Sequence, residues 1–114
     1  MATRYYIRLP EPAKARGSDP DLAFKSEGGE GFAMELENAL RTTELFERWK
    51  AKQEDPDEVD QGMAAVDLNS TVTATHHDLY IDLVVVTSLP GSVFKQRLRW
   101  LAGSNWQLSD VKAA

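Results

Sequence analysis

The spacing of apolar residues alternates between two periods along this chain of 114 residues, and this feature most constrains its fold. From Thr3 to Leu9 every second residue is apolar or β-branched, which is typical of a strand with one buried face. Residues 31–53 instead carry apolar side chains at helical spacing. The same two patterns predict the remaining elements, which are strands over 63–76 and 79–87, a helix over 90–102 and a last strand over 105–111.

The predicted order is therefore strand, helix, strand, strand, helix, strand. This βαββαβ order resembles the ferredoxin-like split βαβ arrangement. The resemblance covers the whole chain and depends on element order, not on a sequence motif. It implies an α+β fold in which a four-stranded antiparallel sheet of order 4-1-3-2 carries both helices on one face. We expect a single domain over residues 1–114, as the length also favours.

The first helical segment cannot be one straight helix. Phe32 and Leu36 belong to one apolar stripe, whereas Leu45 and Trp49 belong to a stripe rotated by more than about 100° at 100° per residue. A break near Arg41–Thr43 lets both stripes face one core, and threonine is a good residue to begin the second helix. In the last helix, we expect Arg97 to stabilise the negative C-terminal end of its own helix.

The two central strand segments pair as a hairpin when residue numbers sum to 155. Ala74 then lies opposite Ile81 and Val72 opposite Leu83, so that apolar residues share one face. Ser70 falls opposite Val85, and His77-Asp78 forms the turn.

Two long connections complete the predicted domain. Residues 11–30 contain clusters of Pro and Gly, and we expect a long, mobile loop there. Residues 54–62 form an acidic loop. Together with the preceding helix it presents carboxylates that could dock a basic protein partner, namely Glu44, Glu47, Glu54, Asp55, Asp57 and Glu58.

Composition excludes several classes of function. The chain has no cysteine, which removes disulfides, thiol nucleophiles and cysteine metal sites. Its longest apolar run, Leu83–Val86, is far shorter than the ~20 residues that span a bilayer. Thirteen Lys and Arg against eighteen Asp and Glu give a net charge of −5, which disfavours broad binding of nucleic acid. We expect a cytoplasmic protein without a membrane segment, and no motif predicts a cofactor.

The sheet face opposite the helices is the candidate binding surface. Outward-facing positions of the first and third predicted strands bring polar, aromatic and β-branched side chains together, namely Arg4, Tyr6, Arg8, Tyr80, Asp82, Val84 and Val86. A contiguous apolar and aromatic patch on a small domain typically marks a contact surface. We therefore expect a non-catalytic interaction module that forms a homodimer through this face. Alternatively, the 11–30 loop or the tail after Asp110 of the same chain covers it.

Two further functions stay open at this point. The polar residues Arg4, Arg8, Tyr80 and Asp82 could bind a small molecule or serve an enzyme, although no pairing of nucleophile and base identifies catalytic residues. Tyr6 and Tyr80 could stack on single-stranded RNA, but the third strand lacks the signature of RNA-recognition domains. His76, His77 and Asp78 are adjacent at a hairpin tip, which is a poor arrangement for metal ligands, so we predict no metal site.

Overall fold

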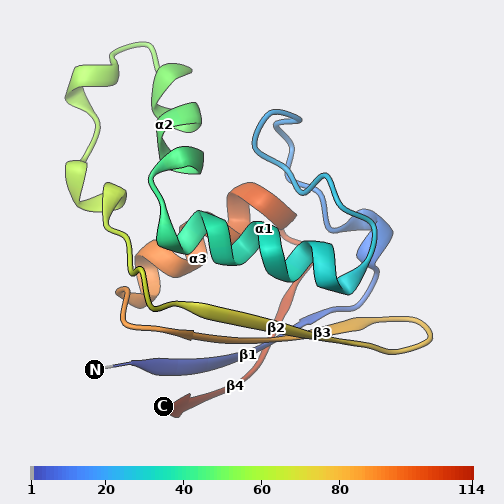
Figure 1. Ribbon diagram of the computed structural model, residues 1–114. Coiled ribbons are helices and arrows are strands. Elements are labelled where there is room, and N and C mark those ends of the chain that lie inside the picture. Colours follow the sequence, from blue (N-terminus) through green and yellow to red (C-terminus); the bar gives the residue numbers. More distant parts are fainter. Residues whose placement is uncertain (1) are drawn as a thin grey trace.

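The computed structural model describes residues 2–114 as four strands and three α-helices (Figure 1). The strands are β1 (Thr3–Leu9), β2 (Thr71–His76), β3 (Ile81–Thr87) and β4 (Gln107–Ala113). The helices are α1 (Gly29–Arg41), α2 (Glu44–Ala51) and α3 (Gly91–Ala102). Short 3₁₀ turns occur at Pro12–Lys14, Pro56–Glu58 and Gln61–Ala64. No helix within the described part is long and apolar enough to cross a bilayer.

The strands form one antiparallel sheet in the order β2-β3-β1-β4. Read from the β4 edge, this order is 4-1-3-2, and the α+β class and the antiparallel sheet are confirmed. Figure 1 shows α1 and α3 over one face of the sheet, with α2 projecting from the same side. No ribbon of residues 2–114 crosses the opposite face, which lies below the sheet in this view.

The core lies between the sheet and the helices. On β1 and β3, buried residues alternate with partly buried ones, as the period of two predicts. The buried strand residues are Tyr5, Ile7, Leu9, Ile81, Leu83 and Val85, and the helices add Phe32, Leu36, Leu40, Val93, Phe94, Leu98 and Leu101. Burying such a side chain contributes about 1.5–3 kcal/mol. The alternation therefore also determines which side chains stay on the uncovered face.

The predicted break in the first helix is confirmed at Thr42 and Thr43, between α1 and α2. Thr42 has an extended backbone with φ −131° and ψ 165°, and its hydroxyl donates to Asn38 O at 3.0 Å. The Glu44 amide donates back to the Thr42 hydroxyl at 3.3 Å, which supplies a partner for one unpaired N–H of α2. The bend lets Trp49 of α2 stack on Trp100 of α3, with ring centroids 5.0 Å apart.

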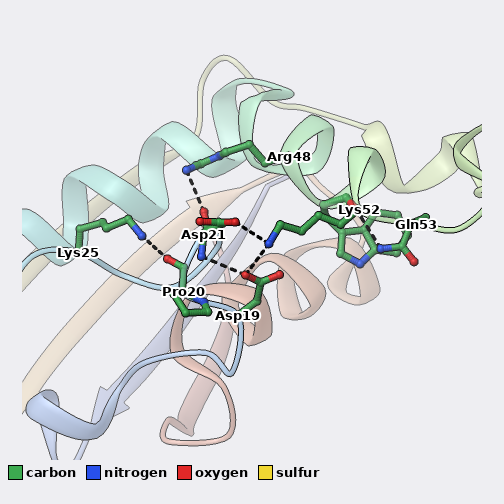
Figure 2. A network of polar contacts seen from close by, with 8 residues as sticks. Asp19, Pro20, Asp21, Lys25, Arg48, Lys52 and Gln53 are labelled. Carbon is green, nitrogen blue, oxygen red and sulfur yellow. Dashed lines mark hydrogen bonds and ion pairs between the residues drawn. The ribbon is translucent and has the colours of Figure 1, made fainter.

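The segment before α1 packs on the helices and not on the uncovered sheet face. The amides of Gly17 and Phe24 both donate to Leu101 O, at 3.0 and 2.9 Å, and the side chain of Phe24 is buried. Figure 2 shows how Lys52, which follows α2, holds this segment through ion pairs with Asp19 at 2.9 Å and Asp21 at 2.6 Å. The alternative that this loop covers the uncovered face is therefore wrong, and the tail after Asp110 does not cover it either, because it belongs to strand β4.

The predicted register of the β2–β3 hairpin is wrong by two residues. Ala74 lies opposite Leu83 instead of Ile81, so residue numbers sum to 157. This register places Ser70 beside Thr87, where the two buried hydroxyls form a hydrogen bond of 2.9 Å. An unpaired buried hydroxyl costs about 1–3 kcal/mol, and Ser70 opposite Val85 would have left one. The turn is consequently longer than predicted and runs from His77 to Tyr80, closed by His77 N donating to Tyr80 O at 2.9 Å.

The second predicted strand, over residues 63–76, begins only at Thr71. The preceding backbone is bound to the helices, because Met63 O and Ala65 O accept from Arg97, and Asp67 N donates to Leu40 O at 2.9 Å. Arg97 itself is fully buried and does not stabilise its own helix end as expected. Its guanidinium reaches the C-terminal part of α1 instead, where it donates to Ala39 O at 2.7 Å.

Asp67 joins this backbone to the end of β3. Its carboxylate accepts from the amides of Ser88 at 2.8 Å and Asn69 at 3.0 Å. These hydrogen bonds, the Ser88 amide first, lower the pKa of Asp67 from 3.8 to about 2. Because the folded pKa is depressed, the stabilisation is present above the unfolded pKa and is lost as pH falls through the folded one.

We expect Asp67→Asn to lower the free energy of unfolding at neutral pH by about 1–2 kcal/mol, allowing for partial exposure. The difference between wild type and variant should shrink from about pH 5 towards pH 2, as the wild-type carboxylate becomes protonated. Urea unfolding followed by circular dichroism measures it, with the exposed Asp57→Asn as control. A difference that stays constant across this range would contradict a role for the charge.

Candidate functional site

The uncovered sheet face brings six of the seven predicted site residues together. We call it the open face and define it by Arg4, Tyr6 and Arg8 on β1 and Asp82, Val84 and Val86 on β3. In the register of β1 and β3 these residues are direct neighbours, namely Arg4 with Val86, Tyr6 with Val84 and Arg8 with Asp82. All six side chains are partly buried. The apolar centre of the face is therefore Tyr6, Val84 and Val86, with charged groups around it.

Tyr80 does not belong to the sheet, contrary to the prediction. β3 begins at Ile81, so Tyr80 lies in the longer hairpin turn. Its ring stacks on His77 with centroids 4.3 Å apart, and the Arg8 guanidinium carbon lies 4.0 Å from the centre of the ring. Tyr80 thus packs at the end of the open face, against His77 and Arg8.

A cluster of polar side chains occupies the end of the open face beside this turn. Arg8 Nε and Nη2 donate to the two carboxylate oxygens of Asp82 at 2.8 and 3.1 Å. His77 Nε2 lies 3.2 Å from Asp82 Oδ2. The hydrogen bond from Arg8 holds the pKa of Asp82 below its ordinary value, and Asp82 in turn raises the pKa of Arg8. Both charges are therefore kept, and Arg8 is held in place by a bidentate pair.

The edge strands extend the open face on both sides. On β2, Thr71, Thr73 and Thr75 are exposed and follow the same parity as Val84 and Val86. On β4, Lys112 pairs with Arg4 and Asp110 pairs with Tyr6, and the Lys112 ammonium lies 5.4 Å from the centre of the Tyr6 ring. The prediction missed these two residues because the β4 register depends on an irregularity between Tyr6 and Ile7.

A shallow hollow of about 410 Å³ lies on this face. Its polar lining includes Arg8, His77 and Lys112, which could attract an anion, but also the carboxylates of Asp82 and Asp110. An anionic ligand at Arg8 would compete with Asp82, which already accepts two hydrogen bonds from Arg8. The geometry therefore supports a face that is balanced in charge more than an anion-binding site.

Two other candidate sites do not gain support from the geometry. Within residues 2–114, no three His, Cys, Asp or Glu side chains are placed to hold a metal ion, and this includes His76, His77 and Asp78. The acidic residues for a basic partner lie at both ends of α2: Glu44 and Glu47 fall in its first turn, whereas Glu54 and Asp55 follow its last residue. The eight residues of α2 between these two groups span about 12 Å along the helix axis.

The comparisons with known proteins add no relationship to this geometry. No protein-family model, no curated protein and no solved structure matches the chain. A fold by itself does not define an activity, since one fold supports many functions. The function of this protein must therefore be argued from the residues of its own surface.

Proposed function

We propose that this protein is a non-catalytic interaction module with a ferredoxin-like fold, and that two copies associate through their open faces. The strand order β2-β3-β1-β4, its antiparallel pairing and the helices on one face support the fold assignment. The observation that carries the function is the apolar centre of the open face together with the adjacent Arg8–Asp82 pair, whose charges complement those of a second copy. The cytoplasmic location and a basic protein partner stay predictions.

A two-fold axis parallel to the strands, between β1 and β3, brings unlike groups together. Each β1 residue then lies opposite the β3 residue with which it pairs within its own sheet. Tyr6 lies opposite the partner's Val84, and Arg8 lies opposite the partner's Asp82. The apolar centres thus cover each other, and the Arg8–Asp82 pairs of the two copies face each other with opposite charges in contact.

The other simple orientation is unfavourable. A two-fold axis in the interface but perpendicular to the strands reverses each strand against its own copy. Arg4 would then lie opposite the partner's Arg8, and like charges across a desolvated contact cost several kcal/mol. Charge repulsion between Arg4 and the partner's Arg8 thus favours the two-fold axis that is parallel to the strands.

The size of the face indicates a weak dimer. Four strands about 4.8 Å apart and seven residues rising about 3.3 Å each give a flat area of roughly 440 Å² per copy. This is at the small end of specific interfaces, so we expect a dissociation constant on the order of micromolar.

The axis can be tested with one substitution at two positions on β2. Under the parallel axis, Thr73 lies opposite the partner's Asp110 and Thr71 lies opposite the partner's Lys112. We therefore expect Thr73→Lys to tighten the dimer about 3- to 10-fold and Thr71→Lys to weaken it by a similar factor. Both threonines are exposed, so folding should be unaffected.

Light scattering across a range of concentrations gives the dissociation constants. A mass of 12.7 kDa at every concentration would contradict self-association. Equal shifts in the same direction for both variants would contradict this axis while leaving a dimer in place.

A further inference from the structure

The two edges of the sheet differ in how they are protected. β4 carries Asp110 and Lys112 and has an irregular register against β1. Charges and irregularities of this kind prevent an edge strand from pairing with another chain. β2 has the sequence Thr-Val-Thr-Ala-Thr-His, with no Asp, Glu, Lys, Arg or Pro, and pairs with β3 in a continuous register. β2 therefore lacks these two protecting features, although Glu37 of α1 already accepts from one of its outward amides, that of Val72, and an added strand would replace that contact.

The backbone groups that face outward from β2 can be identified. Val72 N donates to the carboxylate of Glu37 on α1 at 3.1 Å, so the amide of Val72 points away from β3. Because bonded and non-bonded pairs alternate in an antiparallel ladder, Ala74 and His76 also direct their N–H and C=O outward. No backbone hydrogen bond from outside the sheet reaches Ala74 within residues 2–114.

A groove runs along this free edge. A hollow of about 650 Å³ lies between β2 and the first half of α1. Small residues line this space, namely Gly28, Gly29 and Ala33 on the helix side and Ala74 on the strand. Met34 borders the groove and is 67% exposed, which is unusual for a side chain of this size. Glu30 adds a carboxylate to the same wall.

We propose that the β2 edge binds an extended peptide segment of another protein, which adds as a fifth strand in this groove. Residues of the peptide opposite Val72 and Ala74 would point to the helix side and contact Met34, so they should be apolar. Residues opposite Thr73 would point to the open-face side, so they should be polar. Glu30 favours a Lys or Arg at the flank of the peptide.

Charge argues against a second copy of this chain as the occupant. Pairing β2 with itself around a two-fold axis would bring two copies of α1 together, each with Glu30. β2 has no cation to offset the two Glu30 carboxylates, whereas Glu37 already pairs with Arg41 at 3.5 Å. A basic, alternating peptide meets the same edge without this repulsion.

The experiment uses two synthetic peptides labelled for fluorescence anisotropy. One is Arg-Thr-Val-Thr-Val-Thr-Arg, and its twin carries Glu at both ends. We expect saturable binding of the basic peptide, with a dissociation constant on the order of 10–100 µM, and about tenfold weaker binding of the acidic one. Glu30→Lys should reverse this preference. In wild-type protein, the amide of Ala74 should gain protection from hydrogen exchange when the basic peptide binds.

Matched variants locate the site. Met34→Asp should weaken binding at least about tenfold, whereas Leu68→Asp, at a site 72% exposed and outside the groove, should not. Val84→Glu on the open face should also bind the peptide normally, which separates this site from the proposed dimer. The inference is overturned if no saturable binding occurs up to millimolar peptide, if Glu30→Lys leaves the preference unchanged, or if the Ala74 amide gains no protection. Competition between the peptide and self-association would show that a second copy occupies the edge.

Discussion

Replacing Arg97 by methionine should destabilise the protein by about 3–5 kcal/mol, more than any surface substitution considered above. Arg97 is fully buried and has the largest volume among the fully buried side chains. Methionine is of comparable length and fills much of the same space. The expected loss therefore reflects hydrogen bonds more than a cavity.

The guanidinium of Arg97 joins three segments that are distant in sequence. Nη1 donates to Ala39 O at 2.7 Å, and Nη2 donates to Met63 O and Ala65 O, both at 2.7 Å. Ala39 lies in the last turn of α1, where carbonyls lack helical partners and the helix end carries partial negative charge. Burial lowers the pKa of Arg97, but these carbonyls provide the negative ends of dipoles around its charge. Without Arg97, three carbonyl groups lose a donor at once.

Chemical denaturation with matched variants measures this effect. Arg99→Met changes an exposed arginine on the same helix and should alter the free energy of unfolding by less than about 0.5 kcal/mol. Arg97→Lys keeps the charge but lacks the planar guanidinium group. We therefore expect its free energy of unfolding to lie between those of wild type and Arg97→Met. If Arg97→Met stayed within about 1 kcal/mol of wild type, the three hydrogen bonds would not be important for stability.

The sequence could predict this fold where a local pattern decides the structure. Alternation in Thr3–Leu9 placed the β1 side chains on the correct faces, and the shift of the apolar stripe near Thr42 located the helix break. The hairpin register could not be obtained in this way. Apolar residues match equally well in two registers, and only the long-range bond between Ser70 and Thr87 distinguishes them. Each side chain of the hairpin lies on the same face of the sheet in both registers, since the two registers differ by two residues.

In the candidate site, too, local patterns predicted some features, whereas others depend on long-range contacts. Parity alone placed Arg4, Tyr6 and Val84 on one face, because that requires no knowledge of the register. Tyr80 was misplaced because the extent of the turn depends on the register. Arg97 was missed as a structural centre because its acceptors are 32 or more residues away in sequence. The one local indication of its buried position was that Arg97 lies on the apolar face of its helix, at the spacing of the core residues.

The open face predicts a second large effect. We expect Val84→Glu to raise the dissociation constant of the proposed dimer by at least about 100-fold. Val84 pairs with Tyr6 at the middle of the face, and under the parallel axis it also lies opposite the partner's Tyr6. Each dimer would then bury two carboxylates against apolar and aromatic groups, which costs free energy even with Lys112 near the Tyr6 ring. In the separate chain the same carboxylate stays partly exposed to water, so folding should be preserved.

Light scattering at concentrations around the wild-type dissociation constant measures this change, and circular dichroism verifies the fold of each variant. Val66→Glu makes the same substitution at a valine outside the sheet, 38% exposed, and should leave the dimer intact. Val84→Thr keeps the β-branched shape and should weaken the dimer less than about tenfold, since a hydroxyl is easier to bury than a charge. If Val84→Glu kept the wild-type mass while folded, any association would involve another surface.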